Sequence, residues 1–131
     1  MEGVTYLLDT HVLLWWLFHD RHLSATATKL IANPENRIEV SSASAWEIAT
    51  KHRLGKLDGV EALCQDFPGW LAKAGFDALP ISIAHAQRAG SWEHAHRDPF
   101  DRMLAAQSEL EDIPLVTSDR ALRTFGVTVV W

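Results

Sequence analysis

Short apolar runs that suit β-strands alternate with longer stretches of helical periodicity, and this alternation constrains the fold more than any other feature of the chain. The first run, Val4–Leu8, is apolar or β-branched almost throughout, as in a strand that is buried on both faces. The runs that predict strands are Val4–Leu8, Arg37–Ser41, Phe76–Ile81, Pro114–Thr117 and Val127–Trp131. Strands separated by helices predict an α/β fold, with a central parallel sheet of about four to five strands between two helical layers.

The stretches between these runs predict helices. They cover His11–His19, Ser24–Asn33, Ser44–Leu54, Val60–Ala74, a segment from Ser82, Pro99–Glu111 and Asp119–Phe125. Pro68-Gly69 predicts a kink or a division within Val60–Ala74. Trp15, Trp16 and Trp46 lie in apolar helical stretches and are expected to pack in the core, with a partner-binding groove as the alternative for one or two of them.

Length and composition predict a single globular domain over residues 1–131. The one cysteine, Cys64, excludes an intrachain disulfide and a cysteine-based zinc site. The chain starts without a basic n-region, and no apolar run approaches the roughly 20 residues of a membrane span, so we expect a cytoplasmic protein without a membrane partner. Because the net charge is −5, a nucleic-acid ligand would need locally concentrated basic residues.

Four acids stand at junctions between predicted strands and helices, and each has a structural explanation. Asp9 and Asp119 follow strands and suit the N-caps of the next helices. Ser44–Glu47 has the form of a capping box, in which the glutamate reaches back to the serine N–H. Asp98–Asp101 has the form of an N-cap, an N1 proline and an N3 acid beside the positive end of a helix dipole.

Taken together, these acids favour a metal site. In an open parallel sheet the strand ends and the following helix starts share one edge, so we expect Asp9, Glu47, Asp101 and Asp119 to gather there. Neighbouring carboxylates repel unless a cation intervenes, and oxygen ligands favour Mg²⁺ or Mn²⁺ over zinc. One or two such ions can activate a water molecule that attacks a phosphodiester.

Other chemistries have weaker support. His94 and His96 lack further ligands at zinc spacing, and no phosphate-binding glycine loop is present. Asp9 as an aspartyl-phosphate nucleophile would lack a second aspartate two positions on. His11 and His96 adjoin site acids, where contact with phosphate is the alternative to an ordinary core or surface position.

Four segments, Leu7–Trp15, Ser44–Lys51, His96–Gln107 and Leu115–Asp119, resemble the four motifs of PIN-domain proteins in the right order. The chain is most similar to the VapC-type toxins of bacterial type II toxin–antitoxin systems. The resemblance spans nearly the whole chain and implies a PIN-like α/β/α fold. It also implies a Mg²⁺-dependent endoribonuclease (with Mn²⁺ able to substitute), a cognate VapB-like antitoxin encoded nearby, and a homodimer.

The resemblance assigns the catalytic and metal-binding roles to Asp9, Glu47, Asp101 and Asp119. Asp98 is interpreted mainly as the helix cap, with a supporting role at the metal site left open. Thr117 and Ser118 match hydroxyl positions that orient the fourth acid or a metal-bound water.

Basic residues around these acids are candidates for RNA binding. They are Lys51, Arg53, Lys56, Arg97, Arg102 and Arg120. For Lys51 the alternative is a helical i,i+4 pair with Glu47, and for Arg53 and Lys56 it is a solvated helix end.

Two other functions stay open at this point. One is a regulatory PIN module that binds metal or RNA without cleaving it, although such a module has no chemical need for all four acids. The other is a metal-dependent nuclease or phosphohydrolase that acts on DNA, although flap nucleases are typically longer. The RNA species is not specified by the sequence, because recognition depends on loop shape and a few side chains.

Overall fold

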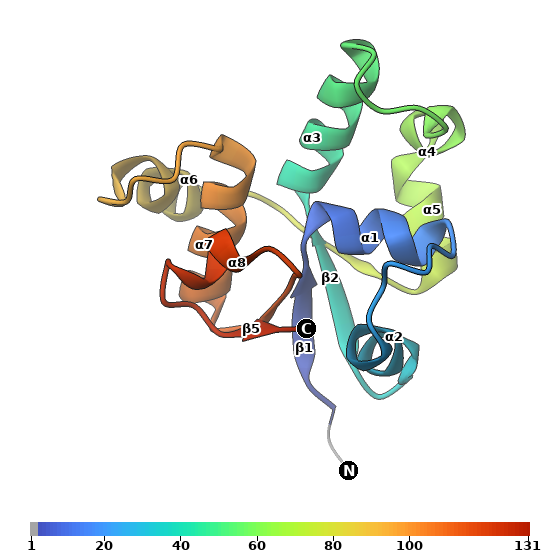
Figure 1. Cartoon of the computed structure of the whole chain (residues 1–131), viewed down its shortest axis with the longest axis horizontal. Coiled ribbons are helices and arrows are strands. Elements are labelled where there is room, and N and C mark those ends of the chain that lie inside the picture. Colours follow the sequence, from blue (N-terminus) through green and yellow to red (C-terminus); the bar gives the residue numbers. More distant parts are fainter. Residues whose placement is uncertain (1–2) are drawn as a thin grey trace.

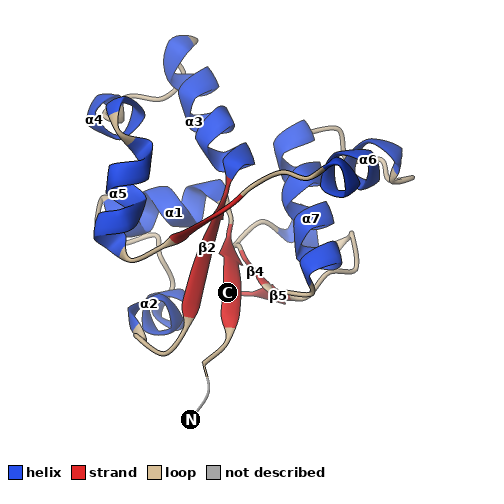
Figure 2. Cartoon of the chain, turned by 180° about the vertical axis from the view of Figure 1, so that it is seen from behind, coloured by secondary structure: helices blue, strands red, loops and turns tan. Residues whose placement is uncertain are grey.

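The structure, a computed structural model, describes residues 3–131, and Met1 and Glu2 lie outside this range. Its five described strands form one sheet in the order β3-β2-β1-β4-β5, with every neighbouring pair parallel (Figures 1 and 2). The strands are β1 (Thr5–Leu8), β2 (Arg37–Ser41), β3 (Asp77–Leu79), β4 (Leu115–Val116) and β5 (Val129–Val130). The prediction of a parallel sheet of four to five strands is confirmed.

Helices cover both faces of this sheet. They are α1 (Thr10–Leu17), α2 (Ala25–Ala32), α3 (Ser42–Arg53), α4 (Glu61–Gln65), α5 (Phe67–Ala74), α6 (Ile83–Ser91), α7 (Pro99–Glu111) and α8 (Arg120–Arg123). The first five helices lie on one side of the sheet, and α6, α7 and α8 lie on the other (Figure 1). Strands β2 and β3 extend the sheet in one direction, whereas β4 returns to the other side of β1. Because crossover connections between parallel strands are almost always right-handed, this change of direction places the two sets of helices on opposite faces. The three-layer prediction is confirmed.

Strand β1 is buried on both faces, as its continuous hydrophobicity predicts. Leu8 packs with core residues of the α1–α5 side, and Leu7 packs with core residues of α7 and α8. Both side chains are fully inaccessible to solvent. Adjacent strand residues point to opposite faces, so one dipeptide anchors two cores.

Two local predictions need correction. The helical stretch 60–74 divides at Asp66, which caps α5 by accepting a hydrogen bond from Gly69 N, and Pro68 lies in the first turn of α5 rather than at the break. Trp46 is 59% exposed and does not pack in the core. Its helix buries the face that carries Ala43, Glu47 and Ile48, so Trp46 points outward.

The strand order creates a topological switch point between β1 and β4. From the end of β1 the chain continues toward β2, and from the end of β4 it continues toward β5 on the opposite side. Connections that diverge in this way leave a crevice at the carboxyl ends of the strands, where open α/β sheets bind ligands. Asp9 directly follows β1, and Thr117 directly follows β4.

None of the helices within residues 3–131 has the length and apolar character needed to cross a membrane.

Candidate active site

Asp9 lies between β1 and α1 and is almost fully buried, with 5% of its surface exposed. Its Oδ1 accepts a hydrogen bond from the backbone N–H of His11 at 3.4 Å, as an N-cap does. Its Oδ2 accepts a hydrogen bond from the Thr117 hydroxyl at 2.5 Å. Burial raises the pKa of Asp9 above its ordinary value, against the effect of the Thr117 hydrogen bond. Asp9 is thus both a helix cap and a buried acid.

The capping box predicted at Ser44–Glu47 is wrong. Helix α3 begins two residues earlier, at Ser42, and its N-cap is Ser41, whose hydroxyl accepts a hydrogen bond from Ala43 N at 3.0 Å. Ser44 is buried inside the helix, and its hydroxyl lies 2.9 Å from the hydroxyl of Thr10 on α1. Glu47 is buried within α3 and therefore has no part in capping the helix.

Glu47 forms an ion pair with Lys51 one turn later, with 2.5 Å between Oε2 and Nζ. The side chain of Glu47 is 6% exposed, and that of Lys51 is 37% exposed. Burial acts to lower the pKa of Lys51, but its hydrogen bond to Glu47 and the charges of Glu47, Asp98 and Asp101 raise it above the usual value. The ammonium group of Lys51 thus lies in the field of several site acids, and the helical pair named as the alternative for Lys51 is present.

Asp98 and Asp101 occupy the start of α7. As predicted, Asp98 is the N-cap, and its Oδ1 accepts hydrogen bonds from the N–H groups of Phe100 and Asp101 at 2.9 and 3.2 Å. Asp101 lies one turn into the helix, where its Oδ2 is 2.8 Å from Nε2 of His96. Burial raises the pKa of Asp101 to about 6, the charges of Asp98 and Asp9 add to this effect, and His96 opposes it.

The fourth acid follows β4. Asp119 is exposed and caps α8, with its Oδ1 accepting a hydrogen bond from Ala121 N at 2.9 Å. Its own N–H donates to the hydroxyl oxygen of Thr117 at 3.0 Å. Thr117 therefore touches both Asp9 and Asp119, while Ser118 is exposed.

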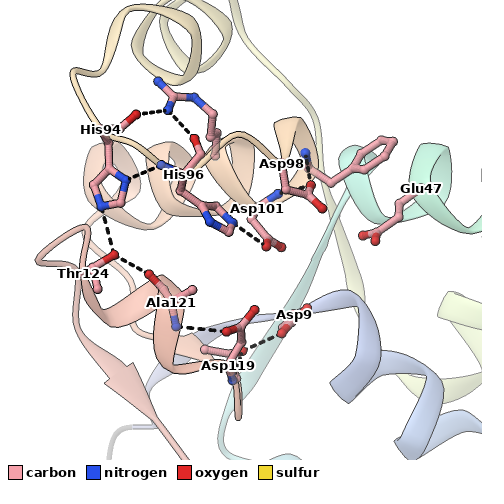
Figure 3. Close-up of polar contacts among 12 residues, drawn as sticks. Asp9, Glu47, His94, His96, Asp98, Asp101, Asp119, Ala121 and Thr124 are labelled. Carbon is pink, nitrogen blue, oxygen red and sulfur yellow. Dashed lines mark hydrogen bonds and ion pairs between the residues drawn. The ribbon is translucent and has the colours of Figure 1, made fainter.

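Figure 3 shows the five carboxylates around a common region at the β1–β4 switch point, with Asp9, Asp101 and Asp119 nearest one another in the view. Three of them are N-caps, Asp9 of α1, Asp98 of α7 and Asp119 of α8. Asp101 lies in the first turn of α7, and Glu47 lies in the middle of α3. Across residues 3–131, no three His, Cys, Asp or Glu side chains lie close enough, as they stand, to hold a metal ion. Asp101 nevertheless feels the charges of Asp98 and Asp9, and Asp9 feels that of Glu47. Buried carboxylates that repel one another are a donor set suited to a hard divalent cation.

The basic residues that are candidates for RNA binding differ in their exposure to solvent. Arg53, Lys56, Arg97 and Arg120 are exposed, and RNA contact by these residues stays a prediction. Arg102 is half-buried, and its guanidinium donates to backbone carbonyls between α6 and α7. Its acceptors are the carbonyl oxygens of Ala89 at 2.8 Å, His94 at 3.0 Å, His96 at 2.7 Å, and Trp92. These bonds give Arg102 a structural role in the α6–α7 loop that the sequence did not indicate.

The contact between His96 and Asp101 was not predicted from the sequence. A ring nitrogen of His96 hydrogen-bonds Asp101, whereas the sequence pattern drew attention to a zinc site or a phosphate contact. The one available signal was its spacing of five residues before a candidate metal ligand.

Known structures share this fold. A chain of the VapBC2 complex from Rickettsia felis, solved bound to a DNA fragment from its promoter, superposes with a TM-score of 0.70 at 17% identity, covering 98% of this chain and 99% of that one. A chain of FitAcB from Neisseria gonorrhoeae superposes with a TM-score of 0.64 at 17% identity and 96% coverage of both chains. At these identities the likeness concerns the fold.

Comparison of sequences identifies the family. The chain is 38% identical over 60 residues to ribonuclease VapC16 of Mycobacterium tuberculosis, a stretch that spans 46% of this chain and only 41% of that relative. The family model of the PIN domain matches residues 6–127, which is nearly the whole chain. The chain therefore belongs to the PIN domain family.

Proposed function

We propose that this chain is a Mg²⁺-dependent endoribonuclease and the toxin component of a type II toxin–antitoxin system. The observation that carries the proposal is the convergence of Asp9, Glu47, Asp101 and Asp119 at the switch point of a PIN fold. The partial match to a ribonuclease of the VapC type supports the RNA substrate. Residues 1–131 act together as a single nuclease domain in this proposal.

The same four acids would hold the metal, with Asp98 beside them as the helix cap. These side chains suit a hard divalent cation because all of them offer carboxylate oxygens as ligands. Burial also raises the pKa values of Asp9 and Asp101. A nearby divalent cation would relieve that unfavourable burial of charge. When bound, Mg²⁺ or Mn²⁺ would supply Lewis-acid activation of water and stabilisation of the leaving oxygen.

The remaining site residues position these acids and bind the substrate. Thr117 holds the Asp9 carboxylate through its O–H, and it fixes the start of α8 by accepting the N–H of Asp119. Lys51 balances the charge of Glu47, and its ammonium group close to the site acids would be able to contact a phosphate of the substrate. The exposed cations Arg53, Lys56, Arg97 and Arg120 would supply the basic surface that an acidic protein needs in order to bind RNA.

The proposed partners follow from the structural relatives. The VapBC2 structure and a toxin–antitoxin complex from Klebsiella pneumoniae, with a TM-score of 0.62, support a cognate VapB-like antitoxin for this chain. We further propose that the protein is a cytoplasmic homodimer. Co-expression with the product of a small neighbouring reading frame should yield a stable complex in which RNA cleavage is blocked.

The substitution Asp9→Asn tests the activity. Wild-type protein should cleave single-stranded RNA in the presence of Mg²⁺ or Mn²⁺, and EDTA should stop the cleavage. The Asp9→Asn variant should not cleave RNA but should keep the circular dichroism spectrum of the wild type. An asparagine can still accept the N–H of His11, so the fold should survive.

The same assay separates the other functions. A folded Asp9→Asn protein that cut RNA at the wild-type rate would contradict the four-acid mechanism. Faster cleavage of a matched single-stranded DNA would favour the DNA nuclease, and tight RNA binding without cleavage under any divalent ion would favour the regulatory module.

A further inference from the structure

The α6–α7 loop carries a histidine that contacts one of the candidate metal ligands. Nε2 of His96 lies 2.8 Å from Oδ2 of Asp101 (Figure 3). An ionised carboxylate can only accept hydrogen bonds, so His96 must donate its Nε2–H. The His96 side chain is 24% exposed and that of Asp101 is 17% exposed, so water competes only partly for this bond.

The backbone of His96 is held at both of its polar groups. Its N–H donates to Nδ1 of His94 at 3.0 Å, and its carbonyl oxygen accepts a hydrogen bond from Nη1 of Arg102 at 2.7 Å. The imidazole therefore reaches Asp101 from a backbone that is anchored on each side. A loop side chain anchored in this way can fix the rotation of the carboxylate it touches.

His94 connects this contact to α8. Because Nδ1 of His94 accepts a hydrogen bond, the neutral ring carries its proton on Nε2, which lies 2.9 Å from the Thr124 hydroxyl. The Thr124 hydroxyl donates in turn to the carbonyl oxygen of Ala121 at 2.5 Å. The His94 ring also stacks on Phe125, with 3.8 Å between ring centroids and 16° between planes.

These contacts form one connected chain of four residues, which we call the histidine bridge: Thr124, His94, His96 and Asp101. It starts at the end of α8, whose N-cap is Asp119, and it ends on the first turn of α7. Two candidate metal ligands from different helices are therefore tied together through the α6–α7 loop.

We propose that His96 is the positioning residue of Asp101, orienting this carboxylate for a divalent cation through its Nε2–H, and that the histidine bridge holds Asp101 in place relative to Asp119. This inference rests on the proposed metal-dependent function. His96 engages Oδ2 of Asp101, so Oδ1 is the oxygen that would be available to a cation. Outer partners of metal ligands typically contribute about ten- to hundredfold in metal affinity or activity.

The test measures Mn²⁺ affinity without RNA, by electron paramagnetic resonance of the free ion. His96→Phe keeps a ring but removes the donor, and Mn²⁺ affinity should fall about ten- to hundredfold. His96→Gln places an amide donor near the position of Nε2 and should recover most of the affinity. His96→Asn places its amide nearer the backbone, where Nδ1 lies, and should not.

The chain offers a matched control. His22 forms a similar pair with Asp20, with 2.6 Å between Nδ1 and Oδ1, on the exposed segment after α1. His22→Gln should leave both Mn²⁺ affinity and RNA cleavage at the wild-type level. His94→Phe keeps the stack on Phe125 but breaks both hydrogen bonds of His94, so it should weaken Mn²⁺ binding less than His96→Phe does.

The outcomes separate this inference from the proposed function. Wild-type Mn²⁺ affinity in folded His96→Phe and His94→Phe would overturn the inference while leaving the nuclease proposal intact. Equal losses in His96→Phe and His96→Gln would overturn the donor role. If His96→Phe does not fold, His96→Gln and His94→Phe decide the matter by the same measurement. Wild-type protein that neither binds Mn²⁺ nor cleaves RNA would instead refute the proposed function.

Discussion

The hydroxyl of Thr117 donates to Oδ2 of Asp9 across 2.5 Å, although the two residues are 108 positions apart in the chain. They meet because β1 and β4 pair in parallel, with Leu8 opposite Val116, so the residues that follow these strands are neighbours. The same hydroxyl oxygen accepts the N–H of Asp119. One threonine side chain thus fixes the position of two candidate metal ligands.

Thr117→Val should damage both stability and activity. It leaves a buried oxygen of Asp9 and the N–H of Asp119 without their partner, and a lost buried hydrogen bond of this kind costs about 1–3 kcal/mol. Urea unfolding monitored by circular dichroism measures the loss, and an RNA cleavage assay measures the activity. Thr117→Ser keeps the hydroxyl and should stay close to wild type, so equal effects of the two substitutions would refute the role of the hydroxyl.

Lys51→Met should have opposite effects on metal and on RNA. The ammonium group lies 2.5 Å from Glu47, so its removal abolishes a repulsion toward any incoming cation, and Mn²⁺ affinity should rise. RNA binding should weaken, because one cation near the phosphates is lost. Titrations with Mn²⁺ alone and with a labelled RNA separate the two effects. Lys51→Arg retains the charge and serves as the control, and unchanged Mn²⁺ affinity in Lys51→Met would contradict the prediction.

Metal affinity should fall as the pH drops through about 6. Burial and the neighbouring acids raise the pKa of Asp101 from 3.8 to about 6, so below that pH a proton competes with the cation for this carboxylate. Mn²⁺ titrations from about pH 5 to about pH 8 measure the change. Asp101→Asn should bind Mn²⁺ weakly at every pH.

The same shift predicts how the metal-free protein responds to pH. A carboxyl group whose pKa is raised in the folded state holds its proton more tightly than the unfolded chain does. Its contribution to stability is therefore present at low pH and declines as the pH rises from 3.8 to about 6. Urea unfolding in EDTA measures the free energy of unfolding across this pH window. It should decline more in wild type than in Asp101→Asn, and the same pH dependence in both proteins would contradict the prediction.

Arg102→Met should destabilise the α6–α7 loop. Arg102 donates to four backbone carbonyls, of Ala89 in α6 and of three loop residues. These bonds are part-buried, so losing each one should cost about 1 kcal/mol. Arg97→Met, on an exposed side chain, provides the control and should change stability by no more than about 0.5 kcal/mol. Similar melting temperatures for the two variants would argue against the structural role of Arg102.

The layered fold could be predicted because its cause is visible in the sequence. A strand buried on both faces needs apolar side chains on both, and Leu7-Leu8 shows this directly. Asp9, Asp98 and Asp119 were correctly predicted to lie at helix starts, because all three cap helices, although Asp98 follows helix α6 and not a strand. Caps mark where helices begin, and in this topology those starts share one edge.

The remaining features depend on tertiary contacts that have no local signature. Three nearby serines, Ser41, Ser42 and Ser44, can each cap a helix, so sequence preference could not choose the true start of α3. Trp46 points outward because tertiary packing buries the face of α3 that carries Ala43, Glu47 and Ile48. Arg102 and His96 act on partners in an irregular loop, where neither helical nor strand periodicity predicts which atoms meet.

The pairing of β1 with β4 also has a consequence for the order of events during protein synthesis. During translation, Thr117 and Asp119 are synthesised more than a hundred residues after Asp9. A growing chain that has not yet reached β4 carries three of the four acids but lacks both the hydroxyl that holds the first and the fourth acid itself. The candidate four-acid site is therefore complete only after β4 has been synthesised and has paired with β1.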